Sequence, residues 1–173
     1  MNFTRIALQQ GLAAGGLIVI IQLFAYVIGM EVYLNPWVGN SRLIVVFAAM
    51  ILANLAVKRE SNETHTFKVA FYSSMIAATV SSLAAVLFHV MLAEWFDPEF
   101  YGKLVDAGMA EMQKSSVAKD AIRGLEGEIE KSLLWWVKPY GQIILWVMGL
   151  FVWSILALII AAFMKHSSNS NKF

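Results

Sequence analysis

Cysteine is absent from the 173-residue chain, so it forms no disulfide, no thiolate metal site and no lipidated cysteine. Charge is also scarce, because 14% of the residues are charged whereas a soluble domain has about 25%. Hydrophobic residues make up 59% of the chain, against roughly 45–50% in soluble domains. The deficit of charge indicates that much of the protein is surrounded by lipid rather than by water.

The apolar residues fall into four long blocks, at 11–30, 43–57, 69–93 and 140–164. A helix needs about 20 apolar residues to cross a bilayer. The second block reaches that length only if residues 40–42 form its first turn, with Arg42 extending toward the interface. We therefore predict an all-α membrane protein with four transmembrane helices, at about 6–30, 40–58, 68–95 and 139–165.

A cleaved signal peptide is the alternative for the first block, because Arg5 precedes the apolar run. The run is longer than the usual apolar region of about 7–15 residues, and no small-residue cleavage site follows Met30. We expect this block to remain as a span.

Charge predicts the orientation of these spans. Four spans place both termini and the 58–68 connection on one side, which holds six basic and two acidic residues. The other side holds seven basic and ten acidic residues. Because Lys and Arg in short loops favour the cytoplasmic face, we expect both termini in the cytoplasm. On the opposite side, four tryptophans next to the apolar blocks predict an aromatic belt at the interface: Trp37, Trp95, Trp135 and Trp136.

The segment 97–132, between the third and fourth spans, is expected to be an extracytoplasmic helical insert. Asp97-Pro98-Glu99 suits a helix start, because proline fits a first turn and acids favour a helix N-terminus. Apolar residues at three- and four-residue spacing then predict two amphipathic helices, with stripes at Phe100, Leu104, Gly108, Met109 and Met112, and at Ala118, Ile122, Leu125, Ile129 and Leu133. Neither stripe makes a core of its own, so each must cover another surface.

Three surfaces are available to the insert: the membrane, the end of the bundle, or a partner protein. Residues 94–138 include nine acids and six bases, whereas interfacial helices usually present a basic face to anionic lipid. We therefore favour the bundle or a partner. For Glu126, Glu128 and Glu130 we prefer a solvated acidic face to a cation site, because no EF-hand spacing surrounds them.

Ionisable residues inside spans are functional candidates. Apart from Arg42, the spans hold only His89 and, at the end of the third, Glu94. These two lie about 140° apart around a helix, so they do not share a face. For His89 we favour a structural hydrogen bond over proton or substrate handling. A metal or haem role ranks last, because neither His65 nor His166 can face it across a bundle.

Small residues mark the expected contacts between spans. The first span carries Gly11 and Gly15 at GxxxG spacing, with Gly16 beside them, and the third carries Ser81 and Ser82. Such residues allow helices to approach closely and to form hydrogen bonds across the contact. Packing within one chain and dimerisation explain this pattern equally well.

The order of these parts resembles the bacterial family catalogued as domain of unknown function 4199. The matching stretches are the glycine-containing 11–16, the basic loop start 57–60, the helix start 66–70, and the insert 100–131 followed by Leu133-Leu134-Trp135. The resemblance covers nearly the whole chain and implies the same four-span architecture in a bacterial cytoplasmic (inner) membrane. It brings no activity and no site residues.

No nucleophile with a nearby base, HExxH motif or intramembrane carboxylate pair occurs in the sequence. We therefore expect a non-enzymatic accessory or scaffold subunit that acts through its insert, with no cofactor and no nucleic-acid partner. Its partners would be the bilayer and either another membrane protein or a second copy of the chain. The alternative is an oligomeric transporter of small solutes or lipid that uses His89, Gln22, Gln142 and the serines of the third span.

Overall fold

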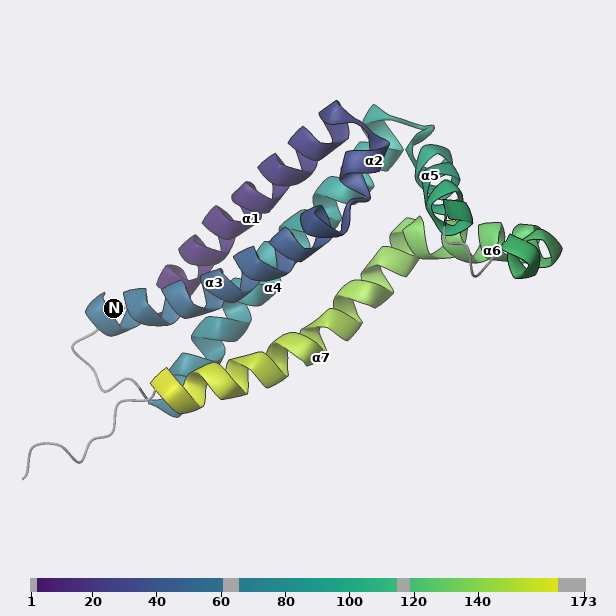
Figure 1. Ribbon diagram of the computed structural model, residues 1–173. Coiled ribbons are helices and arrows are strands. Elements are labelled where there is room, and N and C mark those ends of the chain that lie inside the picture. Colours follow the sequence, from purple (N-terminus) through teal and green to yellow (C-terminus); the bar gives the residue numbers. More distant parts are fainter. Residues whose placement is uncertain (1–2, 61–65, 115–118, 165–173) are drawn as a thin grey trace, which may run out of the picture.

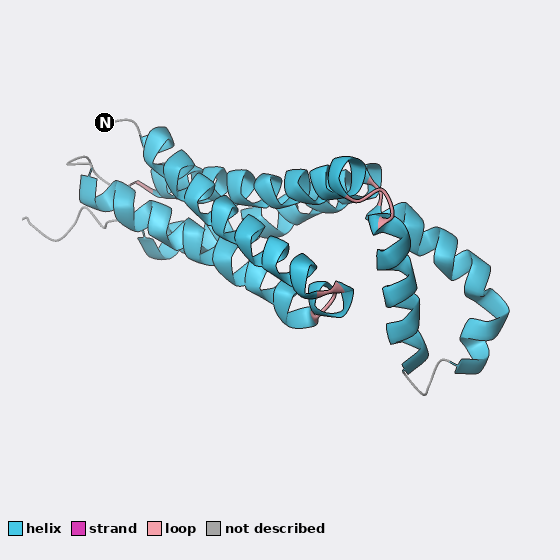
Figure 2. Ribbon diagram, turned by 90° about the horizontal axis from the view of Figure 1, so that it is seen from above, coloured by secondary structure: helices cyan, strands magenta, loops and turns pink. Residues whose placement is uncertain are grey.

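The computed structural model describes residues 3–60, 66–114 and 119–164, and no strand occurs among them (Figure 1, Figure 2). Four helices are long and apolar enough to cross a bilayer: α1 (Phe3–Ile28), α3 (Pro36–Glu60), α4 (Phe67–Met91) with its π-helical extension η1 (Leu92–Phe96), and α7 (Pro139–Met164). The predicted all-α fold with four membrane-spanning helices is confirmed, and the protein is a multi-pass membrane protein.

Local sequence signals set the starts of the spans. Before α3, the Asn35 side chain accepts a hydrogen bond from the Trp37 backbone N–H at 2.9 Å, and Pro36 needs no such partner because it has no N–H. The helix thus begins earlier than the predicted residue 40. Thr66 caps α4 in the same way, accepting from the Val69 N–H at 3.3 Å.

Helix α4 forms the centre of the bundle and packs against the other three spans. In its most apolar stretch 44% of the residues are buried, against 17% in α7, which leaves α7 at the edge of the bundle. The buried face of α4 is made of small residues repeating at helical spacing, which lets its neighbours approach closely: Ala70, Ser73, Ser74, Ala77, Ala78, Ser81, Ser82 and Ala85.

The segment between α4 and α7 forms a helical hairpin, α5 (Phe100–Lys114) and α6 (Lys119–Val137), that we call the arm. Its two helices pack against each other, with Gly108 facing Leu133. The arm projects from one end of the bundle, which we call the arm end (Figure 2). The side chains of Met112, Ile122, Leu125, Glu126 and Glu130, and the whole of Ala118, lie outside the described residues.

The opposite end of the bundle gathers the start of α1, the end of α3, the start of α4 and the end of α7 (Figure 1). Lys58, Arg59 and Lys68 belong to this end. Four exposed tryptophans lie near the arm end, where the spans stop: Trp37, Trp95, Trp135 and Trp136.

Candidate functional site

His89 lies in the last turn of α4, 7% exposed, and connects several elements at the arm end. Its Nε2 is 3.3 Å from the Val137 carbonyl oxygen at the end of α6. Its Nδ1 is 3.1 Å from the hydroxyl of Tyr33 in the short helix α2 (Met30–Tyr33). A carbonyl oxygen only accepts, so Nε2 carries the hydrogen, and the Nδ1 of the neutral ring accepts from Tyr33. The imidazole thus joins α4 to α2 and to the base of the arm.

An aromatic cluster forms around Phe100, the first residue of α5. Phe100 is fully buried, and its ring centroid is 5.1 Å from that of His89 and 5.5 Å from that of Tyr33, both edge-on. Tyr26, in the last turns of α1, contributes a third ring at 5.9 Å. Each favourable aromatic pair contributes about 0.5–1.5 kcal/mol beyond its buried area. The arm is therefore seated on the bundle through its first turn.

Asp97 holds the same turn by hydrogen bonds. Its carboxylate accepts from the Tyr26 hydroxyl at 2.8 Å, from Lys103 Nζ at 3.0 Å to each oxygen, and from the Glu99 N–H at 3.2 Å. Asp97 is 8% exposed, and each of these donors compensates part of the desolvation of its charge. One carboxylate therefore links α1, the turn before α5, and α5 itself.

The pKa values of these groups follow from their contacts. The Lys103 ammonium, with the Tyr26 hydroxyl assisting, holds the pKa of Asp97 below its ordinary value against the opposing effect of burial. In return, Asp97 raises the pKa of Lys103. Burial raises the pKa of Tyr33 to about 12, so its phenol keeps its hydrogen for the bond to His89 at neutral pH.

Glu94 lies apart from His89, exposed on η1. Its Oε1 accepts from the Tyr101 hydroxyl at 3.1 Å. Burial, followed by this bond to Glu94, raises the pKa of Tyr101. The Tyr101 ring lies 6.4 Å from the His89 ring, so the two candidates are connected through Tyr101 and not directly.

The two glutamines of the predicted transport path lie on different helices. Gln22 is buried on α1, and its Oε1 has no hydrogen-bond partner among the described residues. Gln142, on α7, donates to the Trp136 carbonyl oxygen at 3.0 Å. Neither of the two clefts that we describe, one beside Lys103 and one between α3 and α7, is lined by these glutamines or by His89.

The three predicted packing glycines of α1 differ in their contact with α4. A Cβ at Gly11 would lie 2.9 Å from Val80 Cβ, and one at Gly15 would lie 2.7 Å from Ala84 Cβ, so both glycines pack on α4 within the chain. Gly16 differs, because a Cβ there would meet nothing within 4 Å.

The two serines of α4 bond within their own helix, and one also bonds to α7. Ser81 donates to the Ala77 carbonyl and Ser82 to the Ala78 carbonyl. Ser82 also accepts a hydrogen bond from Trp146 Nε1, on α7, at 3.0 Å. Ser82 therefore connects α4 to α7, whereas the bonds of Ser81 lie within α4.

A sharp corner joins α6 to α7 next to the site. A Cβ at Gly141 would collide with the backbone carbonyl oxygens of Trp135 and Trp136, so this position requires glycine. The need for glycine at Gly141, the anchoring role of Asp97 and the tyrosines of the site were not predicted from the sequence. The available signal was the position of the aromatic residues along the chain. Four of them adjoin the ends of apolar segments on the same side as His89: Tyr26, Tyr33, Phe100 and Tyr101.

The family described as "Protein of unknown function (DUF4199)" matches residues 9–166. The chain belongs to this family. The match includes the four spans almost entirely and the whole arm, so the site at the arm end lies within the region that defines the family. Searches of curated proteins and of solved structures give no match.

Proposed function

We propose that this member of the family is a non-enzymatic accessory or scaffold subunit of a cytoplasmic membrane. Its arm lies on the extracytoplasmic side, where it contacts a membrane-protein partner. The observation that carries the proposal is the attachment of the arm at both of its ends. At one end Phe100 is buried and Asp97 is bonded to α1, and at the other Val137 is bonded to His89.

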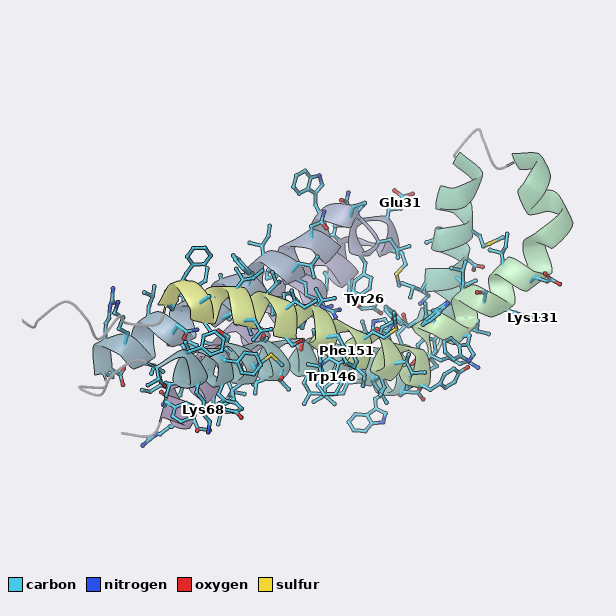
Figure 3. All side chains as sticks on the ribbon, turned by 90° about the horizontal axis from the view of Figure 1, so that it is seen from below. Tyr26, Glu31, Lys68, Lys131, Trp146 and Phe151 are labelled. Carbon is cyan, nitrogen blue, oxygen red and sulfur yellow. The ribbon has the colours of Figure 1, made fainter. Side chains whose placement is uncertain are left out.

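The hydrogen bonds of the site support a structural role for these residues rather than a catalytic one. Both nitrogens of His89 are within hydrogen-bond distance of a protein group, and three donors from other residues converge on the carboxylate of Asp97. Groups used in this way fix the position of an element. The hairpin they fix extends beyond the bundle and is therefore placed for contact (Figure 3, where Lys131 marks α6).

The orientation rests on charge. Lys58, Arg59 and Lys68 lie at the end opposite the arm, and short basic loops favour the cytoplasm. Single cysteines in this cysteine-free chain test it at two exposed acids, Glu31 near the arm and Glu60 at the end of α3. An impermeant maleimide should label Glu31→Cys in intact cells and Glu60→Cys only after permeabilisation. The reverse pattern would overturn the orientation.

Photo-crosslinking in living cells tests the scaffold function. A crosslinking amino acid is placed at Glu128 or Lys131, exposed on α6, and as a control at Phe163, which is 85% exposed on α7. The arm positions should give one discrete adduct with another membrane protein, which the control position does not give. An adduct of two copies of this chain, or no adduct at normal protein abundance, would contradict a role with a different partner.

A further inference from the structure

A cleft of about 580 Å³ opens where α1 meets the arm. Tyr26 and Val27 of α1 and Met30 of α2 form one wall, and Asp97 with Lys103, Asp106 and Ala107 of α5 forms the other. Tyr26 marks its position at the junction of bundle and arm (Figure 3). The cleft thus has an apolar wall from a membrane span and a charged wall from the arm.

The depth of the cleft corresponds to the lipid headgroups. The exposed apolar side of α1, with Val27 at 73% exposure in the cleft wall and Phe24 at 66% nearby, suits contact with acyl chains. The exposed Trp37 and Trp95, of the kind that lie at membrane interfaces, stand at the same end of the bundle. A phospholipid beside α1 would therefore have its chains against α1 and its headgroup at the mouth of the cleft.

The charges of the cleft select among headgroups. Lys103 is half exposed and forms ion pairs with Asp97 at 3.0 Å and Glu99 at 3.5 Å, whereas Asp106 is exposed and forms no ion pair among the described residues. One cation and two anions give the cleft a net negative charge. Asp106 stands three residues after Lys103, on the same side of α5. A headgroup that carries both an ammonium group and a phosphate pairs the ammonium with Asp106 and the phosphate with Lys103. A headgroup with a phosphate alone leaves Asp106 unpaired.

We propose that the cleft binds the headgroup of a zwitterionic aminophospholipid of the phosphatidylethanolamine type. The phosphate lies at the Lys103 ammonium and the primary ammonium at the Asp106 carboxylate, which are neighbours at i,i+3 spacing on α5. One acyl chain follows the exposed side of α1 past Val27. An anionic headgroup such as phosphatidylglycerol is disfavoured, because it brings its phosphate toward two carboxylates without supplying a cation.

Native mass spectrometry of the full chain, purified in detergent with defined mixtures of phosphatidylethanolamine and phosphatidylglycerol, tests this assignment. The wild type should retain phosphatidylethanolamine at least about fivefold over phosphatidylglycerol, a difference of about 1 kcal/mol. Asp106→Asn should bring the ratio close to one. Glu31→Gln removes the same charge at an exposed position outside the cleft and should leave the ratio unchanged.

A second variant makes the test independent of the charge change. Val27→Trp fills the cleft from its apolar wall at an exposed position, and should lower retention of phosphatidylethanolamine severalfold. Equal retention of both lipids by the wild type, an unchanged ratio in Asp106→Asn, or an equal loss in Glu31→Gln would overturn the proposal. Soluble glycerophosphoethanolamine should not displace the lipid. If it does so at equal concentration, the site recognises the free headgroup and the lipid assignment fails.

Discussion

The contact between α1 and α4 should tolerate alanine at Gly16 and not at Gly15. A Cβ at Gly15 would lie 2.7 Å from the Cβ of Ala84, roughly 1 Å inside an ordinary contact between carbon atoms, whereas one at Gly16 would meet nothing within 4 Å. Overpacking of this kind costs about 1–3 kcal/mol. Gly→Ala in a helix also contributes up to about 1 kcal/mol of propensity, but this contribution is common to both variants. Gly15→Ala should therefore be less stable than Gly16→Ala by about 1–3 kcal/mol.

The measurement is reversible unfolding in mixed micelles, followed by tryptophan fluorescence. Because the clash is with one methyl group, Ala84→Gly should restore most of the stability lost in Gly15→Ala, and a double-mutant cycle isolates that coupling. Equal stability of Gly15→Ala and Gly16→Ala, or no rescue by Ala84→Gly, would refute the contact.

Three further predictions concern the arm and the α4–α7 contact. Phe100→Ala removes a fully buried ring, which costs about 3–5 kcal/mol of stability. It should therefore speed hydrogen exchange of the α5 amides by more than about 100-fold. The exposed Phe151→Ala should leave exchange unchanged. The pKa of Asp97 is held below its ordinary value, so its contribution is complete above about pH 4 and is lost as pH falls through the lowered pKa. Acid should therefore lower the protection factors of the α5 amides, which correct for the pH dependence of intrinsic exchange. Asp97→Asn should lower them already at neutral pH, with little further response to acid. A double-mutant cycle of Trp146→Phe and Ser82→Ala should give a coupling near 0.6 kcal/mol, the mean for hydrogen bonds in bilayers. A coupling of zero would show that this bond contributes nothing.

The spans could be predicted because the bilayer imposes a length on each apolar block. The boundaries were less accurate where a polar residue starts the helix. Asn35 and Pro36 begin α3 before its apolar block, since a capping side chain and a proline act locally and do not alter hydropathy. The π-helical η1 was not predicted at all, and a one-residue widening of a helix has no strong composition signal.

The partners of the candidate residues could not be predicted, because they come from distant parts of the chain. Asp97 was identified as a helix start, and the structure adds Tyr26, 71 residues away, as a donor to its side chain. For His89 a hydrogen bond was expected, but its partners Tyr33 and Val137 depend on how α2 and α6 are placed against α4. Periodicity specifies the face of one helix and not the helix that it meets.

The two ends of the arm contact different spans, and this arrangement makes the orientation of the arm depend on the α1–α4 contact. Asp97 is bonded to Tyr26 on α1, while Val137 is bonded to His89 on α4. If α1 shifts against α4, at least one of these bonds must lengthen. Because packed helices respond to an added methyl group by displacement, a change at Gly15, several helical turns below, should reach the arm.

Gly15→Ala should therefore speed hydrogen exchange of the α5 amides as well as lower the stability of the bundle, whereas Gly16→Ala should do neither. Ala84→Gly in the Gly15→Ala background should slow exchange in α5 again, although both residues lie in membrane spans and not in the arm. If Gly15→Ala lowers bundle stability while α5 exchange stays at the wild-type rate, the arm is held by one of its two attachments alone. Exchange in Asp97→Asn would then identify which one, because that variant weakens the attachment to α1, together with the ion pair to Lys103, and leaves the Val137–His89 bond in place.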